Sequence, residues 1–152
     1  MSTIEELEEF DKLKTKVLKY IMYKKRTEKE VKRKFANIEN QYMLDDVIEN
    51  LKEIGYIDDS NYVERAVAEF INLNNLSLKE LKYKLMSKGI ESNVMEDYLD
   101  AHIEELQEYE MNSAKNIILK KQDMEEQQLI QFLLKKGYKM DSIKEAINII
   151  SN

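Results

Sequence analysis

The chain contains no cysteine, no proline and no tryptophan, and only three glycines and one histidine among its 152 residues. The lack of cysteine excludes disulfides, thiol catalysis and thiolate metal sites, and it fits a reducing compartment. The lack of proline removes the residue that most strongly interrupts helices. Because glycine occurs only at positions 55, 89 and 137, no glycine-rich loop can cradle a nucleotide phosphate.

Motifs for catalysis and metal binding are missing as well. His102, the one histidine, follows Tyr98 and Leu99 on an apolar stripe and precedes Glu104, Glu105 and Glu108. A single histidine beside a solvated acidic face is typical of a helix boundary and not of a metal site. We therefore predict that the protein is not an enzyme and that it has no cofactor and no metal site.

No apolar run approaches the 18 residues of a transmembrane helix. The first ten residues hold four acids and no base, the opposite of the charge that begins a signal peptide. The sequence predicts a cytoplasmic protein without a membrane contact.

One helical motif occurs three times. ELKYKLMSKGI at 80–90 and QLIQFLLKKGY at 128–138 align with an offset of 48, which pairs Gly89 with Gly137. A third copy, EVKRKFANIENQY, begins at Glu30 with an offset of 50. A period of about 50 residues is typical of small helical modules in series.

Each repeat reads as three helices. Leu13, Val17 and Ile21 form a helical stripe in the first. Capping boxes at Thr27–Glu30 and Ser77–Glu80 predict the start of the second helix in the first two repeats. The glycines predict helix ends. Further starts are expected at Asp58 or Asp59, at Ser92 or Asn93, and at Asp123 or Asp141.

No strong helix breaker lies between residues 93 and 120, so one helix is expected to run far through this segment. No stretch alternates with period two. We therefore predict an all-α fold, an elongated tandem array of three three-helix repeats with about nine helices. The expected repeats span residues 11–55, 56–106 and 107–152, after an acidic lead-in at 1–10.

The net charge of −6 conceals strong segregation. Residues 11–36 hold eleven bases and three acids, whereas residues 91–112 hold eight acids and no base. Such a chain presents basic and acidic surfaces separately. Its overall field repels phosphate, although a local basic face can still dock on it.

The tyrosines divide into two groups. Tyr20, Tyr56, Tyr62 and Tyr98 lie on or beside apolar stripes and are expected in the core. Tyr23 and Tyr83 lie among lysines. These two are interpreted as partly buried rings, with the alternative that they are exposed and stack on a base or pack against a partner.

With these motifs in view, the chain resembles the RecX family of RecA regulators. The resemblance covers about residues 11–150 and rests on YIMYKKRTEKEVKRKF at 20–35, LKEIGYIDDSNYVE at 51–64, KELKYKLMSKGI at 79–90 and LLKKGYKMDSIKEAI at 133–147. The first repeat departs from the pattern, because FANIENQY at 35–42 replaces the Lys-Gly turn.

The resemblance implies tandem three-helix repeats that bind the RecA filament on single-stranded DNA as a monomer. It implies inhibition of RecA ATPase, strand-exchange and coprotease activity, with weak or indirect contact to nucleic acid. From charge and repeat position we place the interacting face on the following residues: Lys24, Lys25, Arg26, Lys29, Lys32, Arg33, Lys34, Lys82, Tyr83, Lys84, Lys88, Lys120, Lys121, Lys135 and Lys136.

The alternative is a free-standing DNA-binding module, because trihelical units with a tight turn are similar to helix-turn-helix domains. The third helix of each of the first two repeats argues against it. Residues 41–54 carry four acids and one base, and residues 92–106 carry only acids. A recognition helix in a major groove needs the opposite charge.

Overall fold

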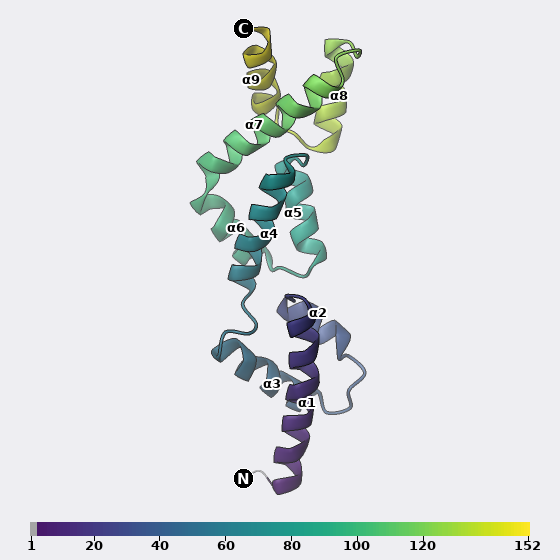
Figure 1. Cartoon of the computed structure of the whole chain (residues 1–152), viewed down its shortest axis with the longest axis vertical. Helices are drawn as coiled ribbons and strands as arrows, with labels where there is room; N and C mark the ends of the chain where they lie inside the picture. Colours follow the sequence, from purple (N-terminus) through teal and green to yellow (C-terminus); the bar gives the residue numbers. More distant parts are fainter. Residues whose placement is uncertain (1–2) are drawn as a thin grey trace. The chain divides into compact units, whose positions relative to one another are not determined.

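The computed structural model describes residues 3–152. These residues form nine α-helices and no strand, which confirms the predicted all-α fold (Figure 1). The helices are α1 (Ile4–Tyr23), α2 (Glu28–Lys34), α3 (Gln41–Glu53), α4 (Asp59–Leu73), α5 (Leu78–Ser87), α6 (Ser92–Ala101), α7 (Ile103–Lys120), α8 (Glu126–Lys136) and α9 (Met140–Ser151).

The chain divides into two compact units. The first extends to Tyr62 and includes Lys88–Ile90, and the second comprises Val63–Ser87 and Glu91–Asn152. The turn Lys88–Ile90 belongs to the second repeat by sequence but packs within the first unit. The repeat boundary expected between residues 106 and 107 falls inside α7.

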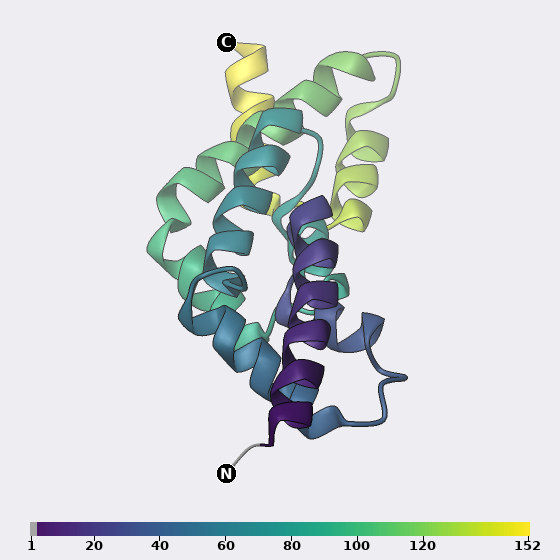
Figure 2. The same ribbon diagram turned by 60° about the horizontal axis from the view of Figure 1, so that its bottom comes forward.

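The first unit is a three-helix core. α1 lies beside α3 (Figure 2) and buries the stripe of Leu13, Val17 and Ile21. The stripe packs into one cluster with Val31 of α2 and with Leu44, Val47, Ile48, Leu51 and Ile57. Leucine, isoleucine and valine side chains at helical spacing therefore form the core of this unit, and its charged residues lie outside the core.

The second unit contains α4 to α9. α7 lies beside α9, and α8 covers the same cluster. Its fully buried members include Ala114, Leu133, Ile143 and Ala146. α4, α5 and α6 bury Val63, Val67, Leu81, Leu85, Met95 and Leu99.

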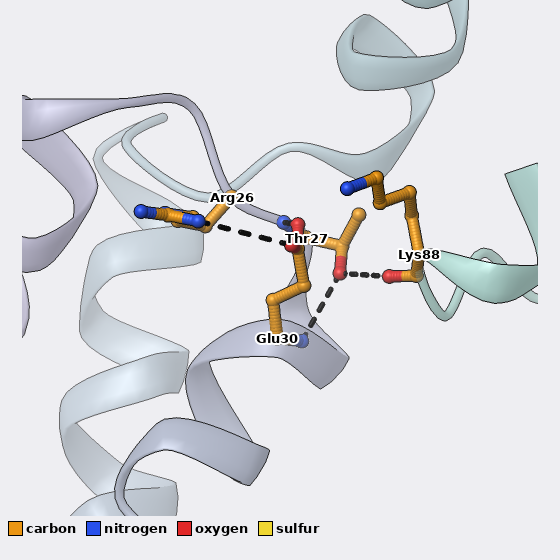
Figure 3. A network of polar contacts seen from close by, with 4 residues as sticks. All are labelled: Arg26, Thr27, Glu30 and Lys88. Atoms are coloured by element: carbon orange, nitrogen blue, oxygen red, sulfur yellow. Dashed lines mark hydrogen bonds and ion pairs between the residues drawn. The ribbon is translucent and has the colours of Figure 1, made fainter.

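Both capping boxes exist and share a second role. Thr27 Oγ1 accepts from Glu30 N at 3.1 Å and donates to the carbonyl of Lys88 at 2.5 Å (Figure 3). In the second unit Ser77 Oγ accepts from Glu80 N at 3.1 Å and donates to the carbonyl of Lys136 at 2.8 Å. Each hydroxyl thus caps one helix at its start and binds the end of another.

A glycine follows each of these carbonyls. Gly89 has φ +87° and Gly137 has φ +103°, the left-handed conformation that ends a helix. A Cβ on Gly89 would lie 2.5 Å from Lys29 Cβ, and one on Gly137 would lie 2.7 Å from Lys79 Cβ. Both the turn and the close approach therefore require glycine.

A buried carboxylate joins three elements of the second unit. Glu110 of α7 is fully buried. Its Oε2 accepts from Leu78 N at 2.8 Å, and its Oε1 accepts from Lys139 N at 3.0 Å and from Ser142 Oγ at 2.9 Å. One side chain therefore satisfies donors at the starts of both α5 and α9, where a negative charge is favourable.

Several local expectations are confirmed and others are wrong. Asp58 caps α4, since its Oδ1 accepts from Asn61 N at 3.0 Å. The helix that begins near residue 93 is expected to run far towards the first helix of the third repeat, but it ends at Ala101. His102 lies between α6 and α7, its ring stacks on Tyr98, and its Nδ1 lies 2.9 Å from the Tyr98 carbonyl oxygen. Neither glycine nor proline marks this break in the sequence.

The expected caps Asp123 and Asp141 are also wrong. Glu125 and Lys139 are the N-cap residues of α8 and α9, and neither makes a side-chain cap hydrogen bond. At α9 the distant Glu110 takes the place of a local cap.

Candidate interaction surface

The acids of α2 are bound within the first unit, whereas most of its bases point outward. Glu28 pairs with Lys52 of α3 at 3.1 Å. Glu30 Oε1 accepts from Thr27 N at 3.0 Å, and its Oε2 lies 4.0 Å from Arg26 Nη1 (Figure 3). Lys29 and Lys32 are exposed and make no ion pair within residues 3–152. The outer face of α2 therefore carries uncompensated positive charge.

The pairing of Glu28 with Lys52 has an electrostatic consequence. A hydrogen bond and the charge of Glu28 raise the pKa of Lys52, with Glu49 as a lesser cause. The carboxylate of Glu28 is therefore paired with a base of α3.

The structure distributes the predicted cations of the first unit unevenly. Arg26 turns inward, because its guanidinium lies 4.2 Å from the centroid of the Tyr20 ring. Lys34 lies over the same ring at 5.7 Å. Lys25 donates to Asn61 Oδ1. Lys25 and Lys34 are nevertheless exposed, as are the remaining predicted cations of this unit: Lys24, Lys29, Lys32, Arg33 and Lys88. We call these five residues the α2 basic surface.

In the second unit the predicted residues fall into two groups. Lys82, Tyr83 and Lys84 lie on α5, where Lys82 pairs with Glu96 at 3.7 Å and Lys84 lies 5.6 Å from the Phe70 ring centroid. The second group surrounds Phe132. Lys121 lies 4.9 Å and Lys136 lies 5.7 Å from its ring centroid, and Lys120 and Lys135 are exposed next to them in sequence.

The tyrosines correct two expectations. Tyr23 and Tyr83 are 86% and 66% exposed and are not the partly buried rings that the sequence favoured. Tyr56, expected in the core, is 44% exposed. The buried rings are Tyr109 and Tyr138, and burial raises the pKa of both phenols.

Buried tyrosines are held by specific partners. Tyr109 donates to the Leu76 carbonyl at 2.7 Å and accepts from Leu76 N at 3.2 Å. The hydroxyl of Tyr138 lies 2.6 Å from Ser113 Oγ. Tyr20, Tyr62 and Tyr98 are half-buried.

Three exposed lysines of α1 were missed by the sequence reasoning. Lys12, Lys16 and Lys19 recur at i, i+4 and i+7 and lie on the solvent side of α1. Helical spacing could have found them, because Leu13, Val17 and Ile21 already fixed the buried face. The predicted set stopped at the block after α1 and so omitted this face.

The third helices do not suit entry into a major groove. The exposed residues of α3 include Asp45, Asp46, Glu49 and Glu53, and those of α6 include Asp97 and Asp100. Their apolar residues are turned into the cores. A basic recognition face is therefore lacking on both helices.

A cavity in the second unit has no marked charge preference. Leucine and isoleucine side chains line it together with three lysines and three carboxylates: Lys79, Lys82, Lys139, Glu96, Asp100 and Glu110. Within residues 3–152 no three His, Cys, Asp or Glu side chains are arranged to hold a metal ion. No helix in that range is both long and apolar enough to cross a membrane.

No family model matches the chain. Among curated relatives, "Regulatory protein RecX" of Finegoldia magna is 34% identical over 84% of this chain and 66% of its own. The protein of the same name from Clostridium perfringens strain 13 is 30% identical over 95% of this chain and 71% of its own.

Among solved structures, the crystal structure of RecX from Lactobacillus salivarius aligns with a TM-score of 0.79 and 27% identity, over 95% of this chain and 98% of that one. The curated relatives that match more than four fifths of the chain are longer, and the chain spans about half to seven tenths of their length.

Proposed function

Because this chain belongs to the RecX family of regulatory proteins, we propose that it binds the RecA filament on single-stranded DNA and inhibits RecA. The expected effects are lower ATPase, strand-exchange and coprotease activity. The proposal also takes the protein to act as a monomer in the cytoplasm, without a cofactor.

The observation that carries the proposal is the separation of charge on the first unit. The α2 basic surface faces outward, while the acids of the same helix are bound to Lys52, Thr27 and Arg26. α3 presents its acids separately. A filament of protein on DNA offers both acidic side chains and phosphate to such a face, and electrostatic complementarity speeds and orients association.

Repetition supports the proposal through effective concentration. A filament repeats the same binding surface along its length, so several modules in one chain can engage neighbouring protomers. Each further contact is then intramolecular, and modest individual contacts add to a higher avidity.

The proposal is tested by reversing charge on the α2 basic surface. Lys24→Glu together with Lys32→Glu changes two exposed side chains that make no ion pair within residues 3–152. Binding to RecA filaments on immobilised single-stranded DNA should weaken by about tenfold or more. Helicity by circular dichroism should not change.

The matched control reverses the same number of charges elsewhere. Lys139→Glu together with Lys144→Glu alters two exposed lysines at α9, outside the proposed contact residues, and gives the same net charge. This control should bind the filament within about twofold of the unchanged protein. Equal weakening by both pairs would mean that net charge matters and that the α2 basic surface does not.

A further inference from the structure

α1 carries a straight row of exposed cations that ends in an exposed aromatic ring. Lys12, Lys16, Lys19 and Tyr23 follow one another at i, i+4, i+7 and i+11, and all four are exposed. At 3.6 residues per turn they lie within about 60° of arc, and they extend over about 17 Å of the helix. We call these four residues the α1 stripe.

The α1 stripe is not neutralised within the described chain. None of its lysines forms an ion pair among residues 3–152. Glu5 and Glu8 precede the stripe on the same face and limit it at the N-terminal side. The positive part of this face therefore begins at Lys12 and continues to the C-terminal end of α1.

Two further cations lie next to the stripe. Tyr20 is half-buried three residues before Tyr23, and the side chains of Arg26 and Lys34 lie over its ring at 4.2 Å and 5.7 Å. Tyr23 itself is 86% exposed at the last residue of α1, followed by exposed Lys24. The exposed ring is thus an uncharged, planar group within a basic neighbourhood.

We propose that the α1 stripe is a binding site for single-stranded nucleic acid, in which Lys12, Lys16 and Lys19 follow consecutive phosphates and Tyr23 stacks on a base. An aromatic ring beside a row of cations is the arrangement that binds single strands without sequence preference. The proposal deepens the proposed function, since it rests on that function for the source of the strand, a filament on single-stranded DNA. The binding itself is tested without RecA.

The geometry favours a single strand over a duplex. Bases in a duplex are stacked on each other, so a surface ring finds no free base face, whereas a single strand exposes one at each nucleotide. It also favours nucleic acid over a protein partner. The lysines recur along a line, which matches a regular polyanion.

The chain lacks tryptophan, so a single substitution supplies a local reporter. Tyr23→Trp places the only indole of the protein at the end of the α1 stripe. Titration with single-stranded oligothymidylate at low salt should give a saturable loss of its fluorescence. Duplex of the same length should give little loss at the same concentration.

Tyr42→Trp is the matched control. Tyr42 is also 86% exposed in the first unit, but it precedes Asp45 and Asp46 on α3 and has no lysine row. Its fluorescence should not respond to the oligonucleotide. A response of the same size at both positions would overturn the proposal, because it would show quenching without a site.

Two further variants separate stacking from charge. Measured by anisotropy of a labelled oligothymidylate, Tyr23→Ala should weaken binding by about 5- to 150-fold, while Tyr23→Phe should retain it. Lys16→Gln with Lys19→Gln should lower the dependence of log affinity on log salt by about 0.7 for each lysine.

Three further results would contradict the proposal: no binding of the oligonucleotide at low salt, binding unaffected by Tyr23→Ala, or fluorescence of the Tyr23→Trp variant that responds to RecA alone but not to DNA. The last result would assign the stripe to a protein contact. Any of these results together with intact regulation of RecA would remove this site and leave the proposed function standing, so the two failures are distinguishable.

Discussion

The hydroxyl of Thr27 donates a hydrogen bond of 2.5 Å to the backbone carbonyl of Lys88, 61 residues later in the chain. Ser77 repeats the relationship with the carbonyl of Lys136, 59 residues later, at 2.8 Å. In both cases a capping hydroxyl at the start of one repeat's second helix binds the end of the next repeat's second helix. A feature that looks local in the sequence therefore also fixes a long-range contact.

Removing a capping hydroxyl should destabilise the chain. Ser77→Ala loses the cap of α5 and the part-buried hydrogen bond to the Lys136 carbonyl, for a cost of about 2 kcal/mol in the free energy of unfolding. Ser77→Thr keeps the hydroxyl that Thr27 uses at the equivalent position and should cost less than about 1 kcal/mol. Urea unfolding monitored by circular dichroism measures both.

An exposed hydroxyl supplies the control for this comparison. Thr15 donates to the carbonyl of Asp11 within α1 at an exposed position. Thr15→Ala should change the free energy of unfolding by no more than about 0.5 kcal/mol. If Ser77→Ala lowers the free energy of unfolding no more than Thr15→Ala does, the hydrogen bonds of the Ser77 hydroxyl contribute little to stability.

Gly137, which ends α8, should not tolerate a side chain. Gly137→Ala forces alanine into φ +103° and places its Cβ 2.7 Å from Lys79 Cβ. Gly55→Ala meets no atom within 4 Å at φ +85°, so it isolates the backbone penalty of about 1–2 kcal/mol.

The difference between the two glycine variants measures the close approach. Gly137→Ala should cost about 1–3 kcal/mol more than Gly55→Ala, because Lys79 must shift to relieve the contact. Thermal unfolding of the two variants would show it. Equal midpoints would contradict a close contact between this turn and Lys79.

Glu110 should be among the most sensitive positions of the second unit. Glu110→Gln replaces one acceptor oxygen by an amide donor that faces N–H groups, since Glu110 accepts from Leu78 N on one oxygen and from Lys139 N and Ser142 Oγ on the other. The expected loss is on the order of 3 kcal/mol. Glu108→Gln, at an exposed position on the same helix, should be nearly neutral in the same unfolding experiment.

The second unit should lose stability at alkaline pH. Burial raises the pKa of Tyr138 above its ordinary value of 10.0, so the folded phenol keeps a proton that the unfolded chain releases. The stabilisation is therefore complete below about pH 10 and declines as pH rises further.

Tyr138→Phe tests this dependence. The variant loses the contact with Ser113 Oγ and should be about 1 kcal/mol less stable near neutral pH. Its free energy of unfolding should fall less steeply above about pH 10 than that of the unchanged protein. Burial also raises the pKa of Tyr109, so the variant should retain part of the pH dependence of stability. If the free energy of unfolding falls equally steeply with pH in both proteins, Tyr138 is not a source of the alkaline instability.

Features that depend on residues close together in the chain were predictable from the sequence. The boxes at Thr27–Glu30 and Ser77–Glu80, the turns at Gly89 and Gly137, and the buried stripe of α1 follow from spacing alone. Capping and periodicity depend on neighbours within four residues, so the sequence holds the required information.

Features that join distant segments were not predictable. The cap of α9 comes from Glu110, about thirty residues earlier, and an acidic residue on an acidic helix gives no sign of it. The buried hydroxyl of Tyr138 is hydrogen-bonded to Ser113, and that of Tyr109 is hydrogen-bonded to Leu76. The guanidinium of Arg26 lies over the Tyr20 ring, a contact that the sequence did not indicate.

The central claim is regulation of RecA, and the most direct test is the single-strand-dependent ATPase rate of the cognate RecA with this protein titrated in. We expect the ATPase rate to fall progressively at far less than one copy of this protein per RecA protomer. An unchanged rate, together with no binding to the filament, would contradict it.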